Sequence, residues 1–417
     1  MTLGHNLRRH IAMNRISIRV SLCLLVVPFI VVACAPPKNE PQKTSGVLLD
    51  NNETGLSARI SYLNIPLEIE GQAANQKPRL AAKALPILTL VAEVVAPIVD
   101  AIQLQATEVQ IIGNKAYVGY NVRGETFLGA VEVYDISNPT HPTLVSNAIF
   151  YDADVNGLYV TGNDVFMAAA TRDPRFSKPA ALMHMTLAGG KLTNSLSRVE
   201  LPSYAGTDVV VFGNKVYVTS GAENGYVTVL DKGTLAFANK FALADARALA
   251  IENDTVVAVA GTPGRMIVFD AVLSSQKSQF SVSGANTEYA KSTIEVVGGK
   301  AILGVGEGGT QVMCVESGTL LGEIAPPVVA GLNSSVTVTN AVTADKSVLF
   351  IANGEAGVYL ATSDKVLSAN HCDALNLTVE GKLKFSGSQS ANHVAYRSDI
   401  LFIATGTGGL KIVSVQN

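Results

Sequence analysis

From residue 107 onward, apolar and polar residues alternate in short runs, a pattern typical of half-buried β-strands. Seven of these runs are strand pairs, each interrupted by Gly-Asn or another polar pair that tolerates positive φ, as a tight hairpin requires. The seven predicted hairpins cover residues 109–120, 158–170, 209–221, 249–261, 294–306, 342–354 and 394–406. Their spacing suits a repeat of four strands.

Third and fourth strands follow each hairpin. Val131–Val145, VEVYDISNPTHPTLV, shows the unit: an alternating strand, a turn at Asn138-Pro139, and a second apolar run. An acidic residue ends four of the third strands, and we expect these residues to form Asx-type turns: Asp135, Asp231, Asp270 and Glu316. Fourth strands are predicted at 143–150, 197–201 and 238–243, but the last repeat ends without one.

The missing strand leaves an open edge that something else must pair. Residues 86–96, PILTLVAEVVA, copy the fourth-strand pattern and are predicted to close the last repeat. The alternative is a short amphipathic helix over 80–93, which Pro86 disfavours. Residues 57–72 are expected to add a hairpin or an edge strand outside the ring. The sequence therefore predicts an all-β, seven-bladed β-propeller of four-stranded antiparallel blades over 107–417, its last blade closed by an N-terminal strand.

The Asp135-Ile-Ser-Asn-Pro139 unit and its weaker copies resemble the LVIVD-type repeat, one blade of a propeller. The resemblance covers roughly 107–417. The resemblance implies the propeller scaffold. It does not identify a ligand or a reaction, because members of that family mostly lack an assigned activity.

The N-terminus carries Arg15 and Arg19, an apolar run over 20–32, and then Cys34. Val31-Val32-Ala33-Cys34 is similar to the lipobox of bacterial lipoproteins, although Val32 stands where Ala or Ser is usual. That resemblance implies a signal peptide over 1–33, with Met13 as an alternative start, and a lipidated Cys34. A plain transmembrane anchor is disfavoured because Pro28 interrupts an already short run.

The rest of the N-terminal region divides in two. Residues 34–55 are expected to be a flexible tether and 56–106 an extension that contains the closing strand. Ala35 follows the cysteine, and by the family rule this directs a lipoprotein to the bacterial outer membrane, on either the periplasmic or the surface side. The body would then contact the membrane only through the N-terminal acyl chains.

Composition narrows the function classes. Apolar residues make up 48% of the chain and charged residues 16%, and the net charge of −3 gives no reason to expect a nucleic-acid partner. The absence of Trp excludes WD40 blades, sialidase-type Asp boxes and the tryptophan-docked blades of quinoproteins. No G-x-S-x-G, H-E-x-x-H, P-loop or Cys-x-x-Cys motif occurs, and no cofactor or metal is indicated.

Two cysteines remain in the body, Cys314 and Cys372. An oxidising compartment would permit them to pair. Alignment of the repeats places Cys314 in the column of Val133, Val229, Val268 and Ile412, an inward-facing strand position. We therefore expect Cys314 to be a buried, unpaired thiol.

A propeller binds ligands at its axial funnel, where each blade presents a similar position. These positions hold polar residues, which are the candidate funnel-binding residues: Glu108, Asn156, Asp208, Arg247, Thr293, Asn340 and His393. One interpretation is that Glu108, Asp208, Arg247 and His393 form an acid–base or metal constellation, with Glu108, Asp208 and His393 as the acid–base set. The alternative, which we favour, is that these side chains are solvated at the rim or bond to backbone groups of neighbouring blades.

The predicted second blade carries an insertion at 171–180, TRDPRFSKPA. Arg172, Arg175, Phe176 and Lys178 make it a basic loop with one exposed aromatic residue, a candidate for recognition of headgroups or of an acidic partner. An ordinary solvated loop is the alternative. His184, between Met183 and Met185, is expected to be packed.

Two functions fit these observations. The first is an envelope-anchored lipoprotein that acts as a non-enzymatic propeller scaffold and binds a protein or glycan partner. The second is a propeller-type hydrolase or lyase whose site lies in the axial funnel, with no confident catalytic residue beyond the acid–base set named above.

Overall fold

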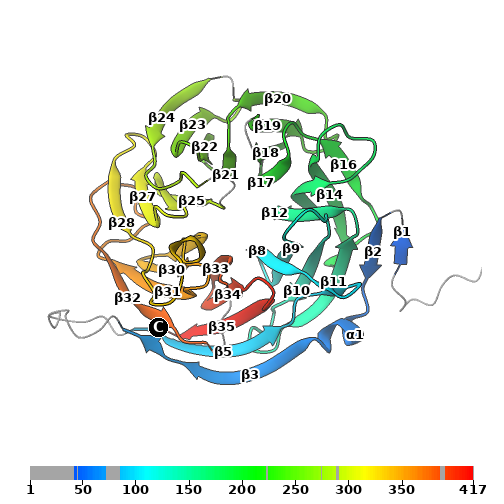
Figure 1. The fold of residues 1–417 in the computed structure, drawn as a ribbon, viewed down its shortest axis with the longest axis horizontal. Coiled ribbons are helices and arrows are strands. Elements are labelled where there is room, and N and C mark those ends of the chain that lie inside the picture. The colour runs from blue at the N-terminus through cyan, green and yellow to red at the C-terminus, as the bar shows by residue number, and fades with distance from the viewer. Residues whose placement is uncertain are drawn as a thin grey trace, which may run out of the picture. The chain divides into compact units, whose positions relative to one another are not determined.

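The computed structural model describes residues 42–44, 46–71, 85–221, 224–273, 275–287, 291–385 and 390–416. All of them belong to one compact unit, residues 39–417. The predicted signal peptide and Cys34 lie outside the described residues. Seven antiparallel sheets stand around a central axis (Figure 1), which confirms the predicted all-β, seven-bladed propeller.

Each blade is a meander of four antiparallel strands, numbered here from the axis outward. Blade 1 is β8 (Gln105–Ile112), β9 (Lys115–Asn121), β10 (Gly129–Asp135) and β11 (Thr143–Phe150). Blade 2 is β12 (Ala153–Thr161), β13 (Asp164–Thr171), β14 (Ala180–Ala188) and β16 (Ser197–Glu200), with the short β15 (Lys191–Leu192) beside β14. Blade 3 is β17 (Ala205–Phe212), β18 (Lys215–Gly221), β19 (Tyr226–Asp231) and β20 (Phe237–Ala242).

Blades 4 and 5 are β21 (Ala246–Glu252), β22 (Thr255–Ala260), β23 (Arg265–Asp270) and β24 (Gln276–Ser281); and β25 (Thr293–Val297), β26 (Lys300–Gly304), β27 (Thr310–Cys314) and β28 (Leu320–Ile324). Blade 6 is β29 (Ala341–Asp345), β30 (Val348–Ala352), β31 (Val358–Ser363) and β32 (Leu377–Leu383). Blade 7 takes β33 (His393–Arg397), β34 (Ile400–Ala404) and β35 (Leu410–Gln416) from the C-terminal end of the chain.

Local turn chemistry produces the hairpins. Gly113 (φ 56°) turns the chain between the first two strands of blade 1, and in blade 4 Asn253 (φ 47°) and Asp254 (φ 60°) do the same without glycine. At the end of β10, Asp135 Oδ1 accepts the Ser137 N–H at 2.9 Å, which confirms the expected Asx-type turn there.

The closing strand is β5 (Ile87–Val94), and it pairs antiparallel with β35 in a register that joins Val94 to Leu410. Its inward side chains Leu88 and Leu90 are buried, as the alternating pattern requires. The prediction that an N-terminal strand closes the seventh blade is therefore confirmed, and over 87–94 the alternative helix is wrong.

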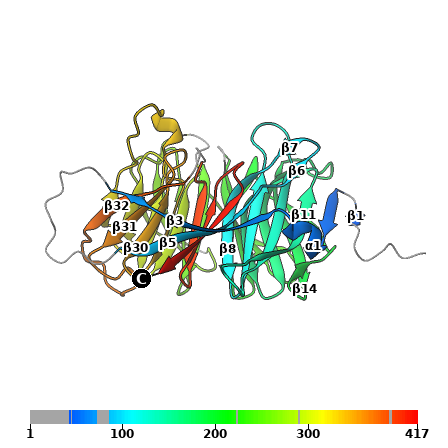
Figure 2. The ribbon, with the colours of Figure 1, turned by 90° about the horizontal axis from the view of Figure 1, so that it is seen from below.

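The segment before β5 runs around the outside of the ring as a strap, residues 47–70 (Figures 1 and 2). Its β2 (Val47–Asp50) pairs with β11 of blade 1, its β3 (Ile60–Leu67) with β5 of blade 7, and its β4 (Ile69–Glu70) with β32 of blade 6. The strap thus spans the point where the ring closes, and β3 is the edge strand expected within 57–72.

Part of the region expected to be a flexible tether is ordered. Besides β2, it contains β1 (Gln42–Thr44) and the short helix α1 (Glu53–Ser57). Val47 and Leu49 are 2% and 6% exposed, so these apolar residues dock onto blade 1 instead of staying in solvent. The predicted tether over 34–55 is therefore too long.

A buried ionic clasp holds the strap to blade 1. Arg59, just before β3, pairs with Glu132 of β10 and donates to the Val95 carbonyl. Glu132 is fully buried and also accepts the hydroxyl groups of Tyr120, at 2.6 Å, and of Tyr134. Burial, followed by the charge of Glu132, holds the pKa of both tyrosines well above the usual range, so both hydroxyls stay protonated donors.

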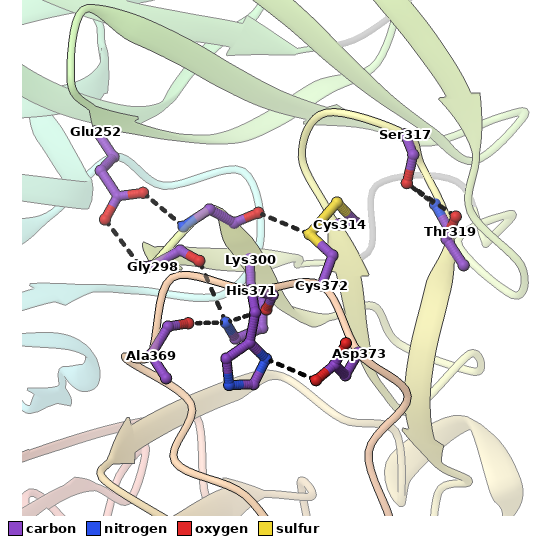
Figure 3. Close-up of a disulfide and its surroundings, with 11 residues drawn as sticks. Glu252, Gly298, Lys300, Cys314, Ser317, Thr319, Ala369, His371, Cys372 and Asp373 are labelled. Carbon is purple, nitrogen blue, oxygen red and sulfur yellow. Dashed lines mark hydrogen bonds and ion pairs between the residues drawn. A yellow bond between two sulfur atoms is a disulfide. The ribbon is translucent and has the colours of Figure 1, made fainter.

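The cysteines of the body form a disulfide, so the expectation of an unpaired Cys314 is wrong (Figure 3). Cys314 is 2% exposed, as its strand position predicts, but its Sγ bonds Cys372, with a Cα–Cα distance of 5.5 Å. Cys372 lies in the long connection between β31 and β32 of blade 6, which folds over the end of β27 in blade 5. Repeat alignment places strand residues, not the path of such a connection.

Lys300 also holds the connection between β31 and β32 in place (Figure 3). Its side chain is completely buried, and Nζ donates to the carbonyl groups of Gly298 at 3.2 Å, His371 at 2.8 Å and Ala369. Burial lowers the pKa of this lysine. The disulfide and the lysine together fasten blade 6 to blade 5.

Reduction of the disulfide is expected to lower the free energy of unfolding by roughly 2–4 kcal/mol, because the bond constrains the unfolded chain between positions 58 residues apart. Urea unfolding with and without reductant measures this. A variant with Cys314→Ala and Cys372→Ala is the control, since its midpoint should not respond to reductant. An unchanged midpoint in the unsubstituted protein would contradict the prediction.

Candidate functional site

A cavity of about 1220 Å³ follows the propeller axis, lined by residues of the inner strands of all seven blades and of the segments that precede them. Six of the predicted funnel residues line it: Glu108, Asn156, Asp208, Arg247, Thr293 and His393. Asn340 is not part of the lining; its amide donates instead to the Ala391 carbonyl at 3.0 Å. The sequence therefore identifies part of the polar wall of this axial channel.

The structure also shows what most of these side chains do. Five of the channel side chains accept a backbone N–H from the next blade: Glu108 from Leu158, Gln110 from Val160 (2.6 Å), Asp208 from Leu249 (3.0 Å), Glu295 from Ala344 (3.3 Å) and His393 Nδ1 from Val109 (3.4 Å). Asn156 works in the other direction and donates to the Gly206 carbonyl at 2.9 Å. Inner strands have no neighbour on the axis side, so these bonds satisfy backbone groups that would otherwise be unpaired. The favoured alternative, bonding between blades, describes these residues.

Arg247 is engaged by Asp245, just before its own strand, and by the connection that leads to blade 5. Its guanidinium forms a two-bond ion pair with Asp245, at 2.6 and 3.1 Å, and donates to the Thr287 carbonyl at 2.7 Å. A Cβ at Gly261 would lie 1.9 Å from Arg247 Nη2, so only glycine permits this approach. Because its charge is paired with Asp245, Arg247 contributes to the structure of the channel wall and is not available as a cation for an anionic ligand.

The channel contains a residue that the sequence analysis missed, Lys291. It comes from the segment before β25, and its ammonium group crosses to blade 1, where Nζ donates to the Thr107 carbonyl at 2.6 Å. Glu108 and Asp208 lie within its electrostatic reach. Lys291 stands two residues before Thr293, so a search for charge just ahead of each inner strand would have found it.

The titratable groups around Lys291 are strongly perturbed by burial. Burial raises the pKa of Glu108 to about 8 and that of Asp208 to about 6. Burial lowers the pKa of Lys291, against the opposing pull of the two carboxyl groups, and it holds the pKa of His393 well below the usual range. At neutral pH the set is therefore a protonated Glu108, a largely ionised Asp208 and a neutral His393.

Raised carboxyl pKa values predict how stability depends on pH. A folded state that holds the Glu108 proton more tightly than the unfolded chain, whose pKa is near 4.5, loses stability as pH rises from about 4.5 to 8. Glu108→Gln keeps the acceptor for Leu158 but does not titrate, so its free energy of unfolding is expected to fall less over that range, by at least about 1 kcal/mol. Urea titrations at pH 5 and 8 measure the difference. Equal slopes for the two proteins would refute it.

The basic loop at 171–180 is more neutral than its sequence suggests. Arg175 forms an ion pair with Asp173, while the Glu200 carboxylate accepts the backbone N–H groups of Ser177 and Lys178. Phe176 is half-buried, not exposed. The loop is thus held in place by its own acids and by those of the neighbouring strand.

Arg172 connects this loop to the mouth of the channel. Its guanidinium lies 5.9 Å from the Phe127 ring, and that ring lies 6.4 Å from the ring of Tyr204, a channel-lining residue that is 56% exposed. Lys178 is exposed. The two candidate surfaces predicted separately, funnel and loop, therefore meet at Tyr204.

One side of the ring, which we call the entry face, is where the inner strands begin. Two segments protrude from it in Figure 2: the hairpin of β6 (Ile98–Val99) and β7 (Ile102–Gln103), and the connection between β28 and β29, which contains the 3₁₀ turn η1 (Ser334–Val336). Ile98 is 64% exposed and Val328 is fully exposed. Apolar side chains at such protruding positions are common in binding surfaces.

The remaining candidates are structural or uninformative. His184 bonds Asp164 at 2.9 Å and stacks on Phe166, so it is packed as expected. Within the described ranges, no three His, Cys, Asp or Glu side chains gather closely enough to hold a metal ion. In the same part of the chain no helix has the length and apolar character needed to cross a membrane.

No family model and no curated protein matches this chain. Among solved structures it is similar to the computationally designed Ika8 protein, with 15% sequence identity over 85% of this chain and 100% of that one, and a TM-score of 0.48. A similarity at this level carries no argument about function, so the proposal below depends on the site itself.

Proposed function

We propose that this protein is an envelope lipoprotein, anchored in the bacterial outer membrane through Cys34, whose propeller is a non-enzymatic scaffold for a protein or glycan partner. The N-terminal sequence, with its lipobox-like Val31–Cys34, supports the anchor. The disulfide between Cys314 and Cys372 supports an oxidising compartment such as the envelope, because cytosolic thiols are normally kept reduced. The LVIVD-like repeats support the propeller scaffold and name no reaction.

The observation that carries the scaffold proposal is the use of the channel's polar groups. Glu108, Asn156, Asp208 and His393 bond backbone groups of neighbouring blades, so they build a rigid, pre-formed wall. Around the mouth of this wall, the entry face presents Tyr204 and the protruding apolar side chains to solvent. A rigid frame with exposed loops on one face is a frequent design for recognition.

A hydrolase or lyase is the second candidate, and one observation favours it. Glu108, Asp208 and His393 line a single cavity together with Lys291, and burial separates the pKa values of the two carboxyl groups, as acid–base pairs require. Glu108→Gln, Asp208→Asn and His393→Gln keep acceptors for the backbone bonds. In the scaffold case this triple variant still captures the partner.

Cross-linking of the full-length protein in intact cells, followed by affinity capture and mass spectrometry, tests the scaffold proposal. We expect one stoichiometric envelope partner, and we expect Ile98→Ser combined with Val328→Ser to reduce its recovery at least about tenfold. Val272→Ser is the matched control, because Val272 is also 64% exposed but follows β23 at the opposite end of the blade. Cys34→Ser should move the protein from the membrane to the soluble fraction.

Two results would contradict the proposal. Recovery of no partner above an untagged control would remove the scaffold function. Equal recovery by the Ile98/Val328 variant and by Val272→Ser would show that the entry face is not the surface used.

A further inference from the structure

Lys291 holds an unusual position among the lysines of this protein. Its side chain is half-buried, lines the axial channel and reaches across it to the Thr107 carbonyl. Within the described residues no carboxylate oxygen lies within 4.0 Å of its Nζ. The amine is therefore held at the cavity by one hydrogen bond, which a ligand can replace.

Two other lysines show the contrast. Lys300 is also buried, but three carbonyl groups surround its Nζ and it does not line the channel. Lys384 lies at the surface beside Glu68 and Glu70, and their charges raise its pKa. Only Lys291 of these three combines a lowered pKa with an open cavity.

The groups that face Lys291 come from three inner strands and have complementary proton states. Glu108 on β8 holds a proton at neutral pH, Asp208 on β17 is largely ionised, and His393 on β33 is neutral. A lowered pKa gives Lys291 more of the unprotonated amine than a surface lysine has at the same pH. A larger share of unprotonated amine, in the same cavity as a neutral acid and a carboxylate, favours amine addition to a carbonyl group.

We propose that Lys291 captures a small aldehyde or ketone in the axial channel as a reversible imine, with Glu108 as the proton donor. The amine nitrogen adds to the carbonyl carbon and forms a carbinolamine. Glu108 then protonates the departing hydroxyl group, and water leaves as the C=N bond forms. The net change is one C=O bond exchanged for one C=N bond with release of one water, without an oxidant or a reductant.

The remaining neighbours suit this product. The Asp208 carboxylate offsets the positive charge of a protonated imine, since it lies within electrostatic reach of the same nitrogen. Leu158, Val209 and Ile294 line the cavity beside the charged groups and offer apolar contact to the body of the ligand. The ligand class is therefore a carbonyl compound with an apolar body. This inference goes beyond the proposed scaffold function, because it makes the channel itself a ligand site, and it does not depend on the identity of the scaffold's partner.

Reductive trapping in the full-length protein tests the inference. The detergent-solubilised protein is incubated with benzaldehyde and cyanoborohydride, which reduces only imines, and the alkylated lysines are mapped by peptide mass spectrometry. At pH 7 we expect Lys291 to be labelled at least about tenfold faster than Lys384, because each unit of pKa changes the unprotonated fraction tenfold. Lys300 should stay unlabelled. All three lysines are read in one unsubstituted chain, so this comparison needs no variant to fold.

Variants then separate chemistry from structure. Lys291→Arg keeps the charge and should abolish labelling at that position. Glu108→Gln keeps the blade-to-blade acceptor but has no proton to donate, so labelling of Lys291 should slow at least about tenfold and lose its decline above pH 8. Labelling of Lys291 no faster than that of Lys384, or a Glu108→Gln rate equal to the unsubstituted rate, would overturn the inference. Failure here with successful partner capture would leave the scaffold proposal standing.

Discussion

A chain that begins at Gln105 is expected to lose cooperative unfolding. Such a chain lacks β5, and with it the whole strap, so β35 becomes an open edge and the inward side chains of blade 7 lose their cover. Leu88 and Leu90 are 2% and 4% exposed in the closed ring and pack in the core between blades 6 and 7. Their loss, added to that of the backbone ladder, exceeds what a marginally stable fold tolerates.

Thermal unfolding followed by circular dichroism measures this effect. The control chain begins at Pro36 and keeps every described strand, so it should melt in one sharp transition. The chain from Gln105 should melt broadly or aggregate through its open edge. Equal midpoints and equal sharpness in the two chains would contradict ring closure by β5.

Arg59→Met is expected to destabilise the protein by about 3 kcal/mol or more, because it leaves the carboxylate of Glu132 buried without a counter-charge. The hydroxyl groups of Tyr120 and Tyr134 still donate to Glu132, but neutral donors do not replace a cation. Breaking a buried pair from one side is more costly than removing both charges. The strap would lose its attachment to blade 1 at the same time.

Urea unfolding of Arg59→Met, Glu132→Gln and the double variant measures this clasp. Gln at position 132 still accepts the tyrosine hydroxyls, so the double variant should recover at least half of the stability that Arg59→Met loses. Additive losses in the double variant would mean that the two side chains do not interact, and the clasp would then be refuted.

The fold could be predicted from the sequence because each blade repeats one pattern of alternation and turn chemistry. Gly113 and the pair Asn253-Asp254 occupy positive-φ hairpin positions that few other residues adopt at low cost. The closing strand was predictable for a different reason: a three-stranded last blade must find a partner, and residues 86–96 carry the right pattern.

The strap and the disulfide were not predictable in the same way. Cys372 reaches Cys314, and His371 reaches Lys300, through a connection between β31 and β32 whose path depends on the neighbouring blade, and no local pattern encodes that path. Residues 34–55 are mostly polar, so the sequence predicted a flexible tether there. Val47 and Leu49 nevertheless belong to a strand, because the edge of β11 is available to pair with it.

The candidate site was predicted in part. Alignment of the inner strands located Glu108, Asp208 and His393 in one cavity, because equivalent positions in a ring face the same axis. It missed Lys291, which lies outside the aligned strand, and it gave no sign that Arg247 is neutralised by Asp245 two residues away. Charges in connections depend on where the backbone turns, which periodicity does not report.

The pairing of β5 with β35 also determines when the protein becomes a folded object. Val94 pairs with Leu410. The contact that completes the ring therefore joins residues that are farther apart in the sequence than those in the other strand pairs of blade 7. During synthesis from the N-terminus, β5 emerges long before its partner β35 exists. Until β35 has been made the ring stays open and its unpaired strand edges are exposed, so a chaperone is most useful in this interval.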